Sequence, residues 1–232
     1  PSGLNEHLER HEYVTRPDIS KVTEEFGLKN MEWLLQDLGV NDANRALIET
    51  RMVGVAGDQL SLVQKMAVHA YTRNEFYEGL NDALRKNAQG EDVEPKWLDF
   101  ARLLDGALSR LPRYAGPVTR GIRRPSSVDL ARFEALQPGE VISLNGYSSA
   151  SYVGKAAFQG PVMLRIKSLS ARKIDNLAYN AKEKEALLGR GLQYRVVARK
   201  LVQGRMFIDL EELSPAELRR LPKEALFAES PV

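Results

Sequence analysis

Three short polar clusters hold the residue types that could carry chemistry. In the first, GPVTRGIRRP, Arg120 precedes Gly121. A planar guanidinium on a strand can bind a phosphate or a carboxylate, and a glycine lets the backbone approach a ligand closely. In the second, NGYSSASY, Ser148 and Ser149 stand where hydroxyls could orient a carboxylate or contact a ribose. By pattern alone both clusters are more typical of structure, namely a solvated arginine and a turn after the Asn-Gly pair.

The third cluster pairs two carboxylates, Glu183 and Glu185, in the segment YNAKEKEALLGRG. Residues i and i+2 of a strand lie on one face, and two carboxylates there repel unless a cationic group sits between them. Such a pair can serve acid–base chemistry or stabilise a developing cation. The alternative is an exposed charge run on a helix or loop, which the KEKE pattern alone favours.

The elements that must position these clusters change character near residue 115. Before it, apolar residues recur at helical spacing, and after it short β-compatible runs are bounded by turn residues. The predicted helices include 58–73, with Asp58 as N-cap, 76–86 and 97–111, and a capped helix begins at Ser214. The predicted strands are 117–122, 140–144, 161–166, 192–201 and 206–210. Helices followed by strands, rather than alternating with them, predict the α+β class.

Composition argues against several kinds of protein. The 232 residues include no cysteine, which removes disulfide scaffolds, thiolate zinc sites and cysteine nucleophiles. Three histidines are too few and too scattered to indicate a metal site. The 33 basic and 31 acidic residues give a net charge of +2, which does not indicate nucleic-acid binding. No apolar run approaches the ~18 residues of a membrane span, and no Gly-x-Gly-x-x-Gly motif indicates a Rossmann site.

Taken in order, the three clusters resemble the Arg / Ser-Thr-Ser / Glu-x-Glu signature of the arginine-type mono-ADP-ribosyltransferases, which are bacterial toxins and effectors. Three longer stretches are similar to the same family: AVHAYTRNEFYEGLNDALRKN, LDGALSRLPRYAGPVTRGIR and EKEALLGRGLQYRVV. The resemblance as a whole extends over roughly residues 58–212. Two positions depart from the pattern. Thr119 stands where the family usually has an aromatic residue, and Ser148-Ser149-Ala150 stands for Ser-Thr-Ser, with Ser151 one position further.

The resemblance implies a domain organisation. A helical N-terminal extension over 1–55 would precede a catalytic domain over 56–232, whose core of two small packed β-sheets forms an NAD cleft. The extension itself matches no pattern of the family. It could bind a target, a secretion chaperone or an immunity protein, or it could buttress the catalytic core.

The resemblance also implies that NAD is cleaved and that ADP-ribose passes to an acceptor. Glu185 would bind the nicotinamide ribose and stabilise the positive charge that develops on it. Ser148 would donate a hydrogen bond to Glu185 and fix its rotamer. Arg120, beside Gly121, would bind a phosphate or ribose of NAD, and Ser149 would line the nicotinamide side.

Glu183 matches the residue that faces the acceptor in this family. A carboxylate there both attracts an arginine guanidinium and can take its proton, so the acceptor is predicted to be arginine on a target protein. The stretch 175–182 would contact that target, and Tyr179 would either stack on the acceptor or pack against the sheet.

The resemblance also implies secretion by a bacterium and action in the cytosol of a target cell. Two alternatives remain open at this point. The chain could be an NAD glycohydrolase or a transferase with a non-protein acceptor, or it could be an inactive transferase-fold interaction module.

Overall fold

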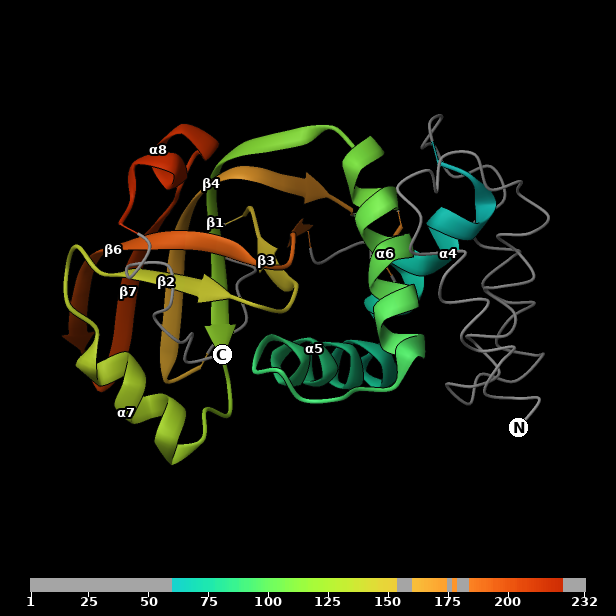
Figure 1. Ribbon diagram of the computed structural model, residues 1–232. Coiled ribbons are helices and arrows are strands. Elements are labelled where there is room, and N and C mark those ends of the chain that lie inside the picture. The colour runs from blue at the N-terminus through green and yellow to red at the C-terminus, as the bar shows by residue number, and fades with distance from the viewer. Residues whose placement is uncertain (1–59, 154–159, 175–176, 179–183, 223–232) are drawn as a thin grey trace. The chain divides into compact units, whose positions relative to one another are not determined.

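The chain divides into two compact units. The computed structural model describes residues 60–153, 160–174, 177–178 and 184–222 (Figure 1). One unit comprises Pro1–Leu111 with Asn176–Ala181, and the other comprises Pro112–Asp175 with Lys182–Val232. The division at Leu111 falls close to the residue where the predicted helices give way to strands. The boundary predicted between residues 55 and 56 lies outside the described residues and stays a prediction.

The first unit contains three described helices, α4 (Leu62–Tyr71), α5 (Asn74–Ala88) and α6 (Pro95–Arg110). They confirm the helices predicted over 58–73, 76–86 and 97–111, with shifted ends. The N-cap of α4 is Ser61, not Asp58 as predicted. The Ser61 hydroxyl accepts from the Gln64 backbone at 3.3 Å, and the Gln64 side chain accepts from the Ser61 backbone at 3.1 Å. This capping box is the Ser-x-x-Gln pattern, which satisfies two backbone donors at once.

Helices α5 and α6 approach each other closely at Gly79. A Cβ added at this glycine would lie 2.6 Å from Cη2 of Trp97, so the indole occupies the space of a side chain. The rings of Phe76 and Phe100 stack nearby with centroids 6.1 Å apart, and both side chains are buried. The absence of a side chain at one position of α5 therefore sets how closely the two helices pack.

Helix α6 also buries a carboxylate. Asp99 is 1% exposed, and neither of its oxygens accepts a hydrogen bond from the part of the chain that the structure describes. The Arg102 guanidinium is 3.8 Å away. Burial raises the pKa of Asp99 to about 6, although the charge of Arg102 opposes this rise.

A short segment distant in sequence belongs to the helical unit. Leu177 and Ala178 are buried, and the Leu177 carbonyl lies 3.0 Å from Nδ1 of His69 on α4. Because a carbonyl oxygen only accepts, His69 carries its proton on Nδ1 and donates it here. The histidine therefore holds the chain just after β4 against the helices.

The second unit contains seven described strands and two described helices. In chain order they are β1 (Arg113–Ile122), α7 (Ser127–Ala135), β2 (Val141–Leu144), β3 (Ser148–Ser151), β4 (Val162–Lys173), β5 (Glu185–Leu188), β6 (Leu192–Val202), β7 (Arg205–Glu212) and α8 (Pro215–Arg220). The order across the sheet is β1-β3-β5-β4-β7-β6-β2, and β1 also pairs with β4. All five predicted strands are present, and the α+β class is confirmed.

The two predicted sheets are joined through β4. Its first half pairs in parallel with β7, from Val162↔Met206 to Lys167↔Glu211, whereas its last residues pair with β5, at Arg172↔Leu187 and Lys173↔Ala186. Opposite β1 the register shifts between these two stretches, which leaves one extra residue on β4. Such a bulge bends a strand and lets one strand serve two arms of a sheet.

A buried carboxylate satisfies the backbone at this bulge. Glu212, 6% exposed, accepts from the backbone nitrogens of Leu169 at 2.6 Å and Ser170 at 3.0 Å. It also accepts from the hydroxyls of Ser168, at 3.3 Å, and Ser170. Glu212 is thus an acceptor for bulge amides that do not follow the regular ladder.

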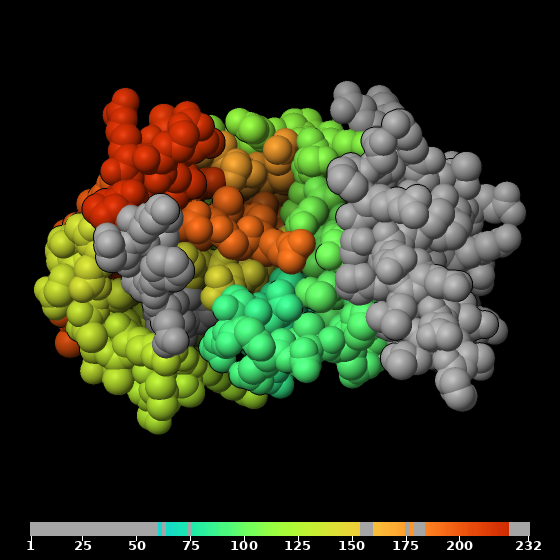
Figure 2. Space-filling model, viewed as in Figure 1, coloured from blue at the N-terminus to red at the C-terminus, as the bar shows by residue number. Residues whose placement is uncertain are grey.

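The core of this unit lies on one face of the sheet. Its buried members include Val118, Ile122, Leu164, Ile166, Ala150, Ala186, Leu188, Tyr194, Ile208 and Leu210, with Phe133 contributed by α7. Helix α7 was not predicted. It lies at the surface (Figures 1 and 2), and Phe133 is its only buried side chain.

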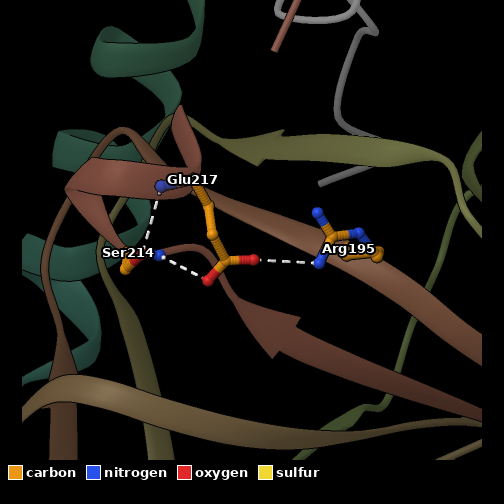
Figure 3. Close-up of polar contacts among 3 residues, drawn as sticks. All are labelled: Arg195, Ser214 and Glu217. Carbon is orange, nitrogen blue, oxygen red and sulfur yellow. Dashed lines mark hydrogen bonds and ion pairs between the residues drawn. The ribbon is translucent and has the colours of Figure 1, made fainter. Parts of the chain in front are cut away.

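The predicted cap at Ser214 is confirmed and continues into the sheet (Figure 3). The Ser214 hydroxyl accepts from the Glu217 backbone at 3.2 Å, and the Glu217 carboxylate accepts from the Ser214 backbone at 3.3 Å. The same carboxylate accepts from Arg195 of β6 at 3.0 Å. The Arg195 hydrogen bond, with those from Ser214, lowers the pKa of Glu217, so α8 is tied to β6 by a charged contact.

Candidate active site

Three adjacent strands carry the three predicted clusters. β3 lies between β1 and β5 in the sheet order. Thr119 of β1 pairs with Ser151 of β3, and Ser151 pairs in turn with Glu185 of β5. Clusters that lie far apart along the chain therefore meet in one row of backbone partners, and Arg120 is next to that row.

Glu185 is held by its backbone at the start of β5. Its carbonyl accepts from the Ile174 nitrogen at 3.1 Å, and the carbonyl of Lys184 accepts from the Tyr152 nitrogen at 3.3 Å. Lys184 has a φ of 49°, the left-handed region that side chains seldom adopt. The Glu185 side chain is 6% exposed. Burying a carboxylate in a strand of apolar residues carries a desolvation cost, and Glu185 is where this burial coincides with the predicted signature.

The register separates the two serines that were predicted to act together. Ser148 pairs with Leu188, whereas Ser149 pairs with Leu187 and Ser151 with Glu185. Because side chains alternate between faces, Ser149 and Ser151 share the face of Glu185, and Ser148 shares the core face of Leu188. The hydrogen bond predicted from Ser148 to Glu185 is therefore not supported by the register.

This register suggests a different alignment of the serine motif. If Ser149-Ala150-Ser151 stands for Ser-Thr-Ser, both outer hydroxyls are retained and only the middle residue differs. Ala150 then points into the core, where a methyl group fits. The Ser151 hydroxyl donates to the Val153 carbonyl at 2.9 Å and accepts from the Val153 nitrogen at 3.2 Å. Ser151 thus shapes the turn after β3, which leaves Ser149 as the candidate for contact with a ligand.

Arg120 lies half-buried on β1 and pairs with Leu164 of β4. Its charge reaches Tyr194, a fully buried side chain whose hydroxyl makes no hydrogen bond within the described residues. Burial raises the pKa of Tyr194 far above its ordinary value, the charge of Glu212 raises it further, and the charge of Arg120 opposes the rise. By the alternation that separates Ser148 from Glu185, Arg120 lies on the face of its partner Leu164, opposite that of Thr119, Ser151 and Glu185.

The acceptor-facing residues stay predictions. Glu183 and Tyr179 lie outside the described residues, and so does most of the stretch 175–182. Within the described ranges, no group of three or more His, Asp or Glu side chains could hold a metal ion. No helix in those ranges is both long and apolar enough to cross a membrane.

Comparison with known sequences agrees with the geometry. The family profile described as NAD:arginine ADP-ribosyltransferase matches residues 23–216. The NAD(+)–protein-arginine ADP-ribosyltransferase Tre1 of Serratia proteamaculans is 31% identical over 133 residues, which are 57% of this chain and 28% of that protein. The chain thus matches little more than a quarter of that relative's length.

Comparison with solved structures concerns the fold. The type III effector XopAI of Xanthomonas axonopodis pv. citri aligns with a TM-score of 0.67 and 19% identity over 92% of this chain and 99% of that one. Exoenzyme S of Pseudomonas aeruginosa, solved with human 14-3-3 protein beta and bound to Carba-NAD, aligns with a TM-score of 0.64 and 21% identity over 87% of this chain and 98% of that one. These similarities confirm the fold inferred from the family signature.

Proposed function

Because this chain belongs to the NAD:arginine ADP-ribosyltransferase family, we propose that it cleaves NAD and transfers ADP-ribose to an arginine of a target protein. The observation that carries the proposal is the row Thr119↔Ser151↔Glu185 across three adjacent strands. This row places a buried carboxylate, a serine motif and the strand of Arg120 together. Such groups fit a substrate that has a ribose and a pyrophosphate.

In this reaction the bond between C1′ of the ribose and the nicotinamide nitrogen breaks, and nicotinamide leaves with the electron pair. Glu185 places a negative charge beside the sugar, where oxocarbenium character develops. A buried carboxylate stabilises that charge more strongly than one in water, because little solvent screens it. Ser149, on the same face of the sheet, orients the carboxylate or the ribose.

Arg120 binds the anionic part of NAD. Its guanidinium remains charged at every physiological pH and presents parallel N–H groups that match two phosphate oxygens. Gly121 follows it on β1 and allows the backbone to approach the ligand. Fixing the pyrophosphate holds the scissile bond against Glu185, which is a contribution of positioning rather than of chemistry.

On the acceptor side, a guanidinium nitrogen forms the new bond to C1′ and loses a proton. Glu183, two residues before Glu185, is the group proposed to attract the guanidinium and take that proton. Tyr179 is proposed to stack on the acceptor. The name of the Serratia relative, a protein-arginine transferase, supports arginine as the modified residue.

We further propose that the protein acts as a bacterial effector or toxin in the cytosol of a target cell. The support is its likeness to a type III effector and to exoenzyme S. Segment 1–55 is proposed to bind a secretion chaperone or an immunity protein, because the Arg, Ser and Glu clusters all lie beyond it, although the family profile already begins at residue 23.

The proposal is tested by following nicotinamide release and protein labelling with labelled NAD in a target-cell lysate. Glu185→Gln keeps the size of the side chain and removes its charge, and it should abolish both signals. Glu211→Gln is the matched control, because Glu211 is a half-exposed carboxylate at the end of β7. If Glu185→Gln labels proteins as well as the parent does, the assignment of Glu185 is wrong.

A further inference from the structure

A lysine ammonium packs on two neighbouring tyrosine rings close to the backbone of Glu185. Nζ of Lys173, the last residue of β4, is 4.3 Å from the ring centroid of Tyr152 and 4.8 Å from that of Tyr114. The two ring centroids are 5.6 Å apart. An ammonium is attracted to the negative face of an aromatic ring at these distances. The contact therefore connects β1, the end of β3 and the end of β4.

The Tyr114 ring is fixed on its own strand. Its hydroxyl donates to the Pro117 carbonyl at 3.2 Å. A Cβ at Gly116 would lie only 3.0 Å from that hydroxyl oxygen, so the glycine provides the space in which the ring folds back over β1. Tyr114 and Tyr152 both pack against the hydrophobic core. Lys173 thus contacts two aromatic rings whose positions are set by the core and, for Tyr114, by its own strand.

The same three strand ends hold the backbone of Glu185. The nitrogen of Tyr152 donates to the Lys184 carbonyl at 3.3 Å, and the nitrogen of Ile174, the residue after Lys173, donates to the Glu185 carbonyl at 3.1 Å. Lys173 itself pairs with Ala186. Both of these hydrogen bonds at the start of β5 therefore come from a member of the lysine–tyrosine cluster or from its neighbour in sequence.

We propose that Lys173 is a positioning residue for Glu185: its ammonium, bound to the rings of both Tyr114 and Tyr152, clamps the strand ends that fix the peptides before and after the carboxylate. The proposal rests on the function proposed above for Glu185. Two observations explain why a clamp is needed. β5 has only four residues, and Lys184 has a positive φ. A strained residue at the end of a short strand persists only where its surroundings hold it.

The test compares variants at position 173 with a matched control. Lys173→Met keeps the length of the side chain without its charge, and it should lower kcat for nicotinamide release by about tenfold while KM for NAD changes by less than about twofold. Lys173→Arg should restore most of the rate, because a guanidinium also binds aromatic faces. Lys167→Met, an exposed lysine earlier on β4, should have no effect.

Amide hydrogen exchange provides a readout that does not depend on activity. In Lys173→Met the amides of Tyr152 and Ile174 should exchange about tenfold faster than in the parent, because the bonds they donate open more often. Unchanged exchange overturns the clamp, whether or not the parent turns over NAD. If Lys173→Met shows faster exchange but keeps the kcat of the parent, the clamp does not position Glu185. If the variant exchanges faster than the parent as expected but the parent turns over no NAD, the proposed function is contradicted and the clamp is still supported.

Discussion

Glu212 is predicted to be the side chain on which the shape of the sheet depends most. Its carboxylate accepts from the backbone nitrogens of Leu169 and Ser170 at 2.6 and 3.0 Å and from two serine hydroxyls. Hydrogen bonds to a charged acceptor contribute about 1.5–3 kcal/mol, against about 1 for a neutral one. Glu212→Gln should therefore cost about 2 kcal/mol. Glu212→Ala leaves two backbone donors without their acceptor and should cost about 4 kcal/mol.

These costs can be measured by urea unfolding and thermal melting. For a chain of this size, about 1 kcal/mol corresponds to a fall in Tm of roughly 2–4 °C. The alanine variant should thus melt about 8–16 °C lower. Glu211→Gln, the neighbouring carboxylate on β7, should change the free energy of unfolding by less than about 0.5 kcal/mol. A cost below about 1 kcal/mol for Glu212→Ala would refute the reasoning, since it would mean that the bulge amides do not depend on this carboxylate.

Three further predictions concern the site and the helical unit. Ser149→Ala should lower kcat for nicotinamide release by about tenfold or more, whereas Ser148→Ala, on the core face, should change it by less than about threefold. Asp99→Asn should stabilise the chain by up to about 3 kcal/mol near pH 8 and should lose this advantage near pH 4. The reason is that burial raises the pKa of Asp99 from 3.8 to about 6, so ionising this carboxylate in the folded parent costs stability as the pH rises through that range. Gly79→Ala should destabilise the chain by about 1 kcal/mol in the presence of Trp97, and should stabilise it by a similar amount in a Trp97→Leu background.

Each of these has an outcome that contradicts it. Equal losses in the two serine variants would mean that the strand register does not decide which hydroxyl faces Glu185. If Asp99→Asn and the parent have the same free energy of unfolding near pH 8 as well as near pH 4, the carboxylate is not desolvated. A destabilising alanine at position 79 in both backgrounds would show that the indole is not what limits the helix approach.

The helices and the longer strands could be predicted because their residues repeat with a clear period. Helix α6 has an apolar stripe that returns every three to four residues, so its bounds were predicted to within two residues. Helix α7 has no such stripe, because Phe133 is its only buried side chain. The true N-cap of α4, Ser61, was missed even though its capping box is visible as Ser-x-x-Gln in the sequence.

The strands that carry the site were harder to predict. β3 and β5 have only four residues each, and every residue of β5 is buried, so neither shows an alternating pattern. The residue types of the site were identified from the family signature, and the register favours a serine motif that starts at Ser149, one residue later than predicted. A shift of one residue moves every side chain of a strand to the opposite face. Only the pairing Ser151↔Glu185 reveals which serines face the carboxylate.

The central claim is that the row from Thr119 through Ser151 to Glu185 belongs to an NAD site from which ADP-ribose passes to arginine. The most direct test is mass spectrometry of proteins from a target-cell lysate after incubation with NAD and either the parent or Glu185→Gln. The account predicts ADP-ribose on arginine side chains with the parent and none above background with the variant. Modification of other residue types, or equal modification by both proteins, would contradict it.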